Sequence, residues 1–178
     1  VTNGMIEGMT ERMIGLSSSH LEALVMRSAE EVSTPEKFRN FTRKIARTDG
    51  ITSAYSEITS SVLAAGSSYR TGAQVRAVDP AVFSENKSYR TMLKVKEGNL
   101  DSFLSGTKNA VVGQKLASLL NLHEGSVFRI ISAQTSPAGI IVPKAAAFKV
   151  AALVSSGYEE LDAVWVFIPL DTAYTALS

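Results

Sequence analysis

The stretch "NAVVGQKLASLLNLHEGSVFRI", residues 109–130, has the pattern of a strand, a helix and a second strand. Gly113 suits a tight turn after the first strand, and Gly125 suits a turn before the second. Three leucines between the two turns lie at helical spacing: Leu116, Leu119 and Leu120. The stretch therefore predicts a domain that contains both helices and strands.

Downstream of this stretch the chain is strongly apolar. The segments "AFKVAALVSSG" (147–157) and "DAVWVFIPL" (162–170) are predicted to be strands, and "TAYTALS" (172–178) is predicted to be a final helix. Apolar runs of this length, bounded by glycine or proline, are typical of buried strands.

Upstream, the segment "HLEALVMR" (20–27) is a short strand candidate. The following segment, 33–50, is predicted to be a helix, with Thr34 as the N-cap, Pro35 in the first position and Gly50 at the end. Its buried stripe is expected to contain Phe38, Phe41 and Ile45.

Two strands are predicted next, at 51–66 and 68–80, and the second ends at Asp79-Pro80. Residues 81–108 are predicted to be irregular, with one helical turn near Tyr89–Leu93. The first unit is thus β-α-β followed by a hairpin strand. A mixture of short strands and helices in this order predicts the α+β class.

Residues 1–16 have the pattern of a helix, because Met5, Met9 and Met13 repeat every four residues. On this pattern alone, two interpretations are equal. The helix either packs on its own domain or continues a longer helix upstream.

Composition excludes several classes of function. The 178 residues contain 45% apolar and 20% charged side chains, no cysteine, and a net charge of +1. This balance gives no reason to expect nucleic acid as a partner. The two histidines are far apart, so no metal site is expected. No glycine-rich phosphate loop occurs, so no cofactor is expected. No apolar run approaches the roughly 20 residues of a membrane-spanning helix.

The sequence contains one pattern that is typical of catalytic serines. Ser84 and Lys87 fit S-x-x-K, in which one helical turn places a lysine beside a serine nucleophile. The chain is short for a serine hydrolase with this motif, and the companion S-D-N motif is absent. We therefore predict no catalytic residue, with the serine hydrolase kept only as a contrasting hypothesis.

The segment "QTSPAGIIVPK" (134–144) is too apolar for an ordinary loop and too rich in proline for a central strand. Pro137 and Pro143 enclose a glycine and three consecutive aliphatic residues. Two interpretations are open: the aliphatic residues form an exposed tip that binds a partner, or they fold back as a local core.

Four segments, taken together and in order, resemble one family. They are "VTNGMIEGMTERMIG" (1–15), "VRAVDP" (75–80), the 109–130 stretch and "SSGYEELDAVWVFIPLDTA" (155–173). This order and spacing resemble the extracytoplasmic domain of LolC/LolE-type lipoprotein-releasing ABC transporter permeases, and more loosely the MacB and FtsX superfamily. Each motif is weak by itself, and the four in order are fairly specific.

The resemblance implies a two-lobed domain. Residues 1–15 would be a stalk helix that continues a membrane helix, and 16–66 with 157–178 would form a Porter-like β-α-β lobe. Residues 67–156 would form an inserted, strand-rich Sabre-like lobe that carries a hairpin at 132–146. In the family pattern another strand follows the final helix.

The resemblance also implies a function without catalysis. Such a domain lies on the periplasmic side of a permease in the inner membrane and transmits ATP-driven motion. Its partners would be a cognate ATPase subunit and a second permease subunit, both through the membrane part, and a periplasmic lipoprotein carrier or a lipoprotein. The alternative is a MacB-like efflux permease or an FtsX-like permease that regulates a cell-wall hydrolase.

In LolC-type members the hairpin is a hook that inserts into the carrier, beside a polar pad. The partner-binding positions implied here are Arg129, Pro137, Ala138, Gly139, Ile140, Ile141, Val142, Pro143 and Lys144. The sequence departs from that pattern in two respects: the tip methionine is absent, and Ala145 and Ala146 stand where the pad has glutamine and arginine. LolE-type members carry a different loop at this place.

Overall fold

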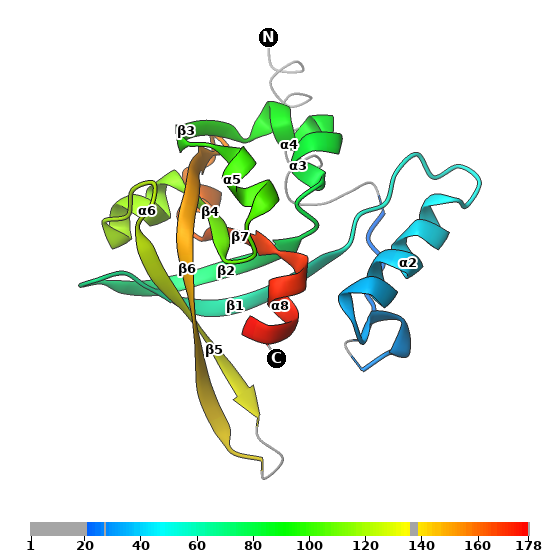
Figure 1. Cartoon of the computed structure of the whole chain (residues 1–178), viewed down its shortest axis with the longest axis horizontal. Helices are drawn as coiled ribbons and strands as arrows, with labels where there is room; N and C mark the ends of the chain where they lie inside the picture. The colour runs from blue at the N-terminus through cyan, green and yellow to red at the C-terminus, as the bar shows by residue number, and fades with distance from the viewer. Residues whose placement is uncertain (1–20, 27, 136–138, 178) are drawn as a thin grey trace.

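A computed structural model of the chain describes residues 21–26, 28–135 and 139–177. Within this part, the strands are β1 (Glu57–Ala65), β2 (Arg70–Val78), β3 (Lys94–Gly98), β4 (Asn109–Gly113), β5 (Val127–Thr135), β6 (Ile141–Ser155) and β7 (Trp165–Pro169). The helices are η1 (Glu30–Val32, a 3-10 turn), α2 (Pro35–Ala46), α3 (Val82–Glu85), α4 (Lys87–Met92), α5 (Leu100–Ser105), α6 (Gln114–Leu120), α7 (Glu159–Asp162) and α8 (Leu170–Ala176). The predicted α+β class is confirmed (Figure 1).

The described strands pair into one seven-stranded sheet of order β3-β6-β4-β7-β2-β1-β5. A further pairing between β5 and β6 closes six of these strands into a ring. The long strand β6 makes this closure possible: its first part pairs with β5, and its second part pairs with β4 and β3. Closure leaves few free strand edges, which an open sheet would have to protect in other ways.

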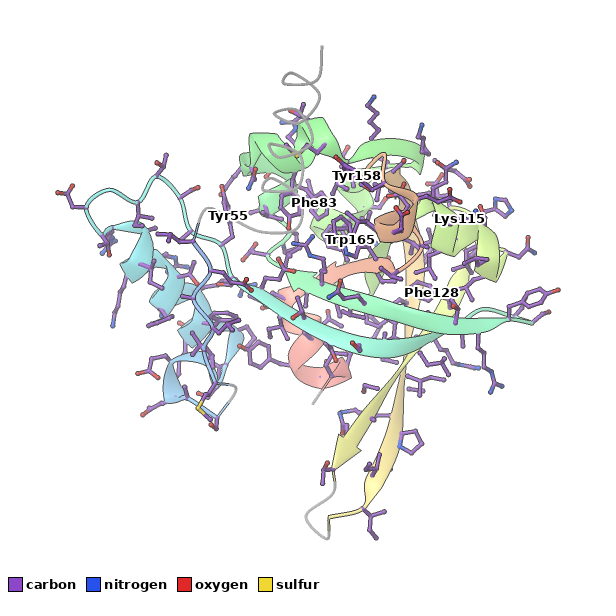
Figure 2. The ribbon with its side chains drawn as sticks, turned by 180° about the vertical axis from the view of Figure 1, so that it is seen from behind. Tyr55, Phe83, Lys115, Phe128, Tyr158 and Trp165 are labelled. Carbon is purple, nitrogen blue, oxygen red and sulfur yellow. The ribbon has the colours of Figure 1, made fainter. Side chains whose placement is uncertain are left out.

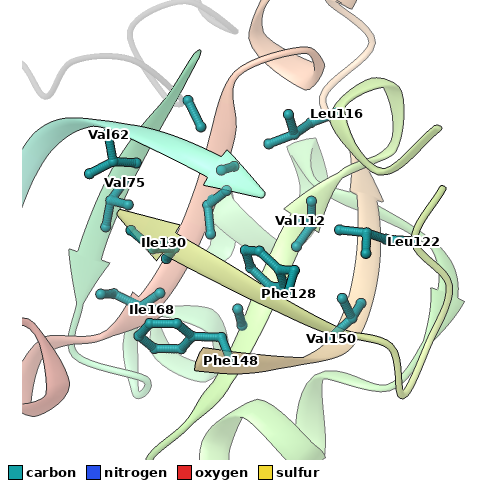
Figure 3. Close-up of a cluster of buried hydrophobic side chains, with 14 of the residues drawn as sticks. Val62, Val75, Val112, Leu116, Leu122, Phe128, Ile130, Phe148, Val150 and Ile168 are labelled. Carbon is teal, nitrogen blue, oxygen red and sulfur yellow. The ribbon is translucent and has the colours of Figure 1, made fainter. Parts of the chain in front are cut away.

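The interior of the ring is filled by apolar side chains from alternate strand positions. Ala110 and Val112 point into this inner cluster, whereas Val111 between them belongs to a second cluster on the outer face. Opposite orientation of neighbours follows from the pleat of a strand. Phe128 and Phe148, which face each other across β5 and β6, lie in the middle of the inner cluster (Figure 3). Helices α6 and α8 contribute the residues that complete it: Leu116, Ala117, Leu120, Ala173 and Ala176.

The outer cluster lies between the sheet and the short helices α3, α4 and α5. The ring of Phe83 makes edge-to-face contacts with Phe103 and Phe167, at centroid distances of 5.2 and 5.5 Å. Phe83, Tyr158 and Trp165 gather at the end of the molecule opposite the hairpin of β5 and β6 (Figure 2). The helical turn predicted near Tyr89–Leu93 is confirmed by α4, whereas the prediction that the rest of 81–108 is irregular is wrong, because α3, β3 and α5 also occupy this range.

The predicted helix at 33–50 is confirmed in its start and corrected in its end. The Thr34 side chain accepts a hydrogen bond from the Lys37 backbone N–H at 3.2 Å, as an N-cap does. The helix ends at Ala46, four residues before Gly50. Its stripe is half-buried rather than buried, because α2 lies to one side of the sheet and contacts mainly η1 and α8.

The β-α-β beginning is also corrected. Residues 21–26 form no strand, and Leu21 and Leu24 are 77% and 89% exposed. A strand without a neighbour leaves its backbone groups unpaired, so the apolar pattern of residues 21–26 is not sufficient to make them a strand. The strand predicted at 51–66 begins only at Glu57, and β2 confirms the strand predicted at 68–80. The helix predicted at 1–16 lies outside the described residues.

Strands from both predicted lobes join the same sheet. Strand β1, assigned to the Porter-like part, pairs with β2 of the Sabre-like part from Glu57↔Val78 to Ala65↔Arg70. Because this sheet is continuous across the two predicted parts, it does not define where one lobe ends, and the lobe boundaries stay a prediction. Among the residues that the structure describes, no helix combines the length and apolarity needed to cross a membrane.

Candidate functional site

The β5–β6 hairpin leaves the sheet and projects from it. Strand β5 pairs with β1 only from Arg129 to Ile131, whereas its pairing with β6 continues to Thr135↔Ile141. Four further pairs extend past the last contact with β1. At about 3.4 Å per residue they lift the end of the ribbon roughly 14 Å from the sheet. Figure 1 shows this ribbon as a separate arm.

The three consecutive aliphatic residues of the hairpin face solvent. Ile140, Ile141 and Val142 are 63%, 71% and 48% exposed. They do not fold back into a local core, so the tip is exposed, and its binding to a partner stays a prediction. Gly139 has φ of +77°, a left-handed conformation that favours glycine. Pro137 and Ala138 lie outside the described residues.

The two faces of the ribbon differ. On one face, Ser132 donates a hydrogen bond to the Ala176 carbonyl at 3.3 Å, which ties the base of the arm to α8. The other face meets β1 at an open apolar hollow of about 420 Å³. This outer hollow is lined by residues whose side chains share that face, Ser61, Leu63, Ile131, Ala133, Ile141 and Pro143, and by Val62 and Ser132, which lie between them on the strands and belong to the opposite face. The strand register places Ile141 and Pro143 on the outer face, with Val142 and Lys144 on the opposite face.

Charge on the arm is of one sign. Between Gly125 and Tyr158 the charged residues are Arg129, Lys144 and Lys149, all basic. Arg129 is exposed and lies at the base, opposite Ala65 of β1 and Ala147 of β6. The structure therefore brings Ile140–Lys144 together along the arm and places Arg129 at the opposite end of the ribbon.

The backbone of the S-x-x-K pattern does not form one helix. Asn86 is extended, with ψ of 107°, and separates α3 from α4. Ser84 and Lys87 are thus not on one continuous helical turn, and the Ser84 hydroxyl donates to the Ala81 carbonyl at 2.9 Å. Among the described residues, no group of three or more His, Asp or Glu side chains is placed to hold a metal ion. His20 lies outside them.

Sequence reasoning missed a buried ion pair next to the outer cluster. Arg76 is only 7% exposed and donates to both Glu57 carboxylate oxygens, at 2.5 and 2.8 Å, and to the Tyr89 hydroxyl at 2.8 Å. Its guanidinium lies 4.7 Å from the Trp165 ring centroid. The alternation of polar and apolar residues along β2 predicts that Arg76 faces solvent. The pattern does not show that α3 and α4 cover this face of the strand, so the prediction is wrong.

No family model matches the chain, and no curated protein matches its sequence. Solved structures are similar in fold. One is the extracellular domain of the noncanonic ABC-type transporter YknZ from Gram-positive bacteria, with a TM-score of 0.53 and 14% identity over 78% of this chain. Another is the periplasmic region of MacB from Actinobacillus actinomycetemcomitans, with a TM-score of 0.50 and 15% identity over 88% of this chain. The chain spans 65% and 59% of the lengths of these two structures, and the likeness establishes the fold.

Proposed function

We propose that the chain is the extracytoplasmic domain of an ABC transporter permease, and that it binds a protein partner through the β5–β6 arm without catalysing a reaction. The observation that carries this proposal is the exposure of Ile140, Ile141 and Val142 on a ribbon that projects from the sheet. The similarity in fold to two transporter domains supports the transporter part.

The arm is physically suited to docking. Burying each of the three aliphatic side chains in a partner would contribute about 1.5–3 kcal/mol before the costs of ordering. The strand pairing from Ser132↔Lys144 to Thr135↔Ile141 already fixes the backbone, so less conformational entropy is lost on binding. The outer hollow extends the apolar surface from the arm to β1.

For the partner, we propose a periplasmic lipoprotein carrier or a lipoprotein, as the LolC/LolE resemblance implies. In this proposal the cognate ATPase and the second permease subunit bind through the membrane part of the permease. The domain transmits their ATP-driven motion to the arm. An efflux permease is the second candidate, because MacB-like domains share this fold.

The test measures binding of a purified periplasmic lipoprotein carrier to the immobilised domain by biolayer interferometry. We expect Ile141→Asp to weaken binding at least tenfold, because a charge would enter an apolar contact worth more than about 1.4 kcal/mol. Leu119→Asp on α6 is the matched control, since Leu119 is also exposed, at 49%, and lies outside the arm.

Wild-type affinity in Ile141→Asp would contradict the role of the arm. If the wild-type domain does not bind the carrier at any concentration tested, the lipoprotein-release hypothesis is wrong and the efflux or hydrolase-regulating alternative is favoured.

A further inference from the structure

Helix α2 is attached to the rest of the molecule by few contacts. It is flanked by η1 on one side and by residues 47–56, which have no regular structure, on the other. Not one of its residues is buried. Phe38, Phe41 and Ile45, its apolar stripe, are all half-buried. The inner and outer core clusters contain no residue of η1 or α2.

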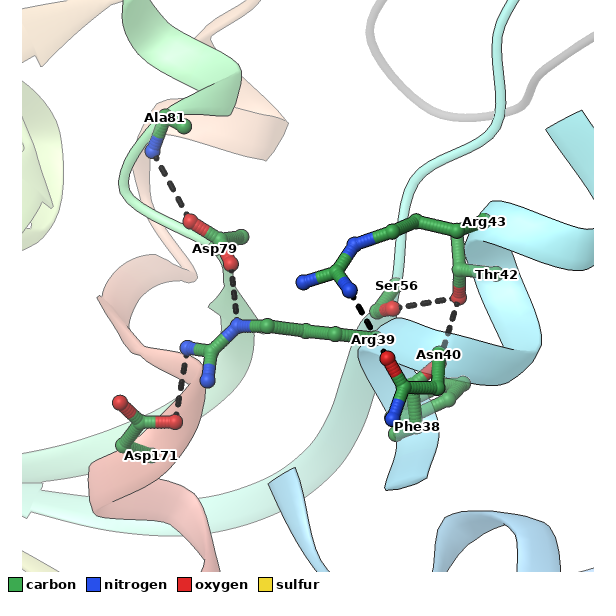
Figure 4. Close-up of polar contacts among 9 residues, drawn as sticks. All are labelled: Phe38, Arg39, Asn40, Thr42, Arg43, Ser56, Asp79, Ala81 and Asp171. Carbon is green, nitrogen blue, oxygen red and sulfur yellow. Dashed lines mark hydrogen bonds and ion pairs between the residues drawn. The ribbon is translucent and has the colours of Figure 1, made fainter. Parts of the chain in front are cut away.

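Arg39 makes the main polar connection between α2 and the sheet region. Its Nε donates to Asp79 Oδ2 at 2.5 Å, and its Nη2 lies 2.7 Å from Asp171 Oδ1 (Figure 4). Asp79 follows the end of β2, and Asp171 lies in the first turn of α8. One side chain therefore bridges α2 to two separate elements.

Two further hydrogen bonds hold this region. The hydroxyls of Thr42 and Ser56 are 2.6 Å apart, and the Tyr174 hydroxyl of α8 donates to the Val32 carbonyl at 2.8 Å. The first bond joins α2 to the segment just before β1. The second joins η1 to α8, so η1 and α2 are fastened together to the same side of the sheet.

We propose that η1 and α2 form a docking unit, residues 30–46, that binds the sheet region reversibly, with Arg39 as its latch. Elements with few buried apolar contacts open locally at a lower free energy than the core of the same protein. Ion pairs that are partly exposed contribute modestly and are weakened by salt. Arg39, Asp79 and Asp171 have side chains that are 27%, 32% and 56% exposed, which places the latch in this class.

Release of Arg39 is also expected to affect the turn between β2 and α3. Asp79 accepts a hydrogen bond from the Ala81 N–H through its other carboxylate oxygen, at 3.2 Å, where the chain turns into α3. Docking of α2 thus fixes a carboxylate that orders the start of α3. The latch residues Arg39, Asp79 and Asp171 all lie outside the arm, so docking of α2 does not depend on the partner proposed for the arm.

Hydrogen–deuterium exchange followed by mass spectrometry tests the latch. In Arg39→Gln we expect the amides of residues 36–46 to exchange roughly fivefold to thirtyfold faster, as the loss of two partly exposed ion pairs implies. Exchange in β2, β4 and β7 should stay unchanged. Arg43→Gln is the matched control on the same helix, because Arg43 Nη1 bonds only to Asn40, within α2, among the contacts that the structure records.

Two further measurements test whether the ion pairs of Arg39 cause this effect. In 1 M NaCl, where the screening length is about 3 Å, wild-type exchange of 36–46 should approach that of Arg39→Gln, and the variant itself should respond little. The double change Asp79→Asn and Asp171→Asn should reproduce the faster exchange from the other side. Equal exchange of 36–46 in wild type and Arg39→Gln overturns the proposal, and so does acceleration spread equally over the strands.

Discussion

At the scale of single residues, Arg76 determines how the outer face of β2 is built. A buried guanidinium is stable only when its donors are satisfied, and here Glu57 and Tyr89 accept from it while aromatic rings cover it. This environment changes the pKa of the Tyr89 phenol. Burial, the largest cause, raises the pKa of Tyr89 from 10.0 to about 12, although the charge of Arg76 acts in the opposite direction.

This shift predicts a defined alkaline titration. In the folded protein Tyr89 keeps its proton up to a pKa of about 12, whereas in the unfolded chain it ionises near 10.0. The unfolded state therefore binds fewer protons between these values, and the free energy of unfolding falls as pH rises through this window. Phenolate absorbance near 295 nm in wild type minus Tyr89→Phe should show a midpoint at about 12. A midpoint at 10.0 would refute the burial argument.

Gly113 shows how a correct prediction can rest on the wrong reason. The sequence suggests a tight turn, but Gly113 has φ of −60°, which any residue adopts. The requirement is space: a Cβ at this position would lie 2.3 Å from the Asp162 carbonyl oxygen. Gly113 thus permits the close approach of the end of α7 to the β4–α6 junction.

We accordingly expect Gly113→Ala to destabilise the fold by about 1–3 kcal/mol, as overpacking against fixed backbone does. Urea unfolding followed by circular dichroism measures this change. Gly72→Ala in β2 is the control, since among the described residues no atom beyond its two chain neighbours lies within 4 Å of the added Cβ. Equal stability of the two variants would show that α7 moves aside at little cost.

At the scale of elements, the sequence predicts the helices and strands whose hydrophobic pattern continues over many residues or whose first or last residues are typical caps. The 109–130 stretch becomes β4, α6 and the start of β5, and Thr34 and Pro35 correctly begin α2. Within 81–108 only the helical turn that becomes α4 is predicted, and α3, β3 and α5 are missed because they have at most six residues each. Elements so short show no period, and tertiary packing stabilises them: Phe83 and Phe103, each a single anchor, lie in the outer cluster.

Some features of the candidate site can be predicted from the sequence, and others cannot. An apolar, proline-framed segment was visible in the sequence, and its projection depends on local strand pairing that hairpin signals indicate. Arg39 and its two carboxylates were not visible as a group, since they come from three elements that are distant in the chain. The half-burial of α2 was also hidden, because an apolar stripe such as Phe38–Ile45 does not reveal how much surface is available to cover it.

At the scale of the whole molecule, the closed ring separates stability from the proposed binding function. Every residue of the two core clusters lies in or beside the ring, and none of the described residues of the arm beyond Ser132 and Lys144 belongs to them. The ring should therefore fold without the arm. The arm is then free to carry exposed aliphatic residues that would be costly to accommodate in the core.

A truncated chain tests this separation. Replacing residues 133–143 by Asn-Gly joins Ser132 to Lys144, which face each other in the register, through a two-residue hairpin turn. The free energy of unfolding should change by less than about 1 kcal/mol, because most of the described side chains among those removed are exposed. Gln134 is removed with them, and its buried Nε2 has no hydrogen-bond partner among the described residues. A loss of several kcal/mol in urea unfolding would mean that the arm stabilises the ring, and that its apolar residues serve the fold before any partner.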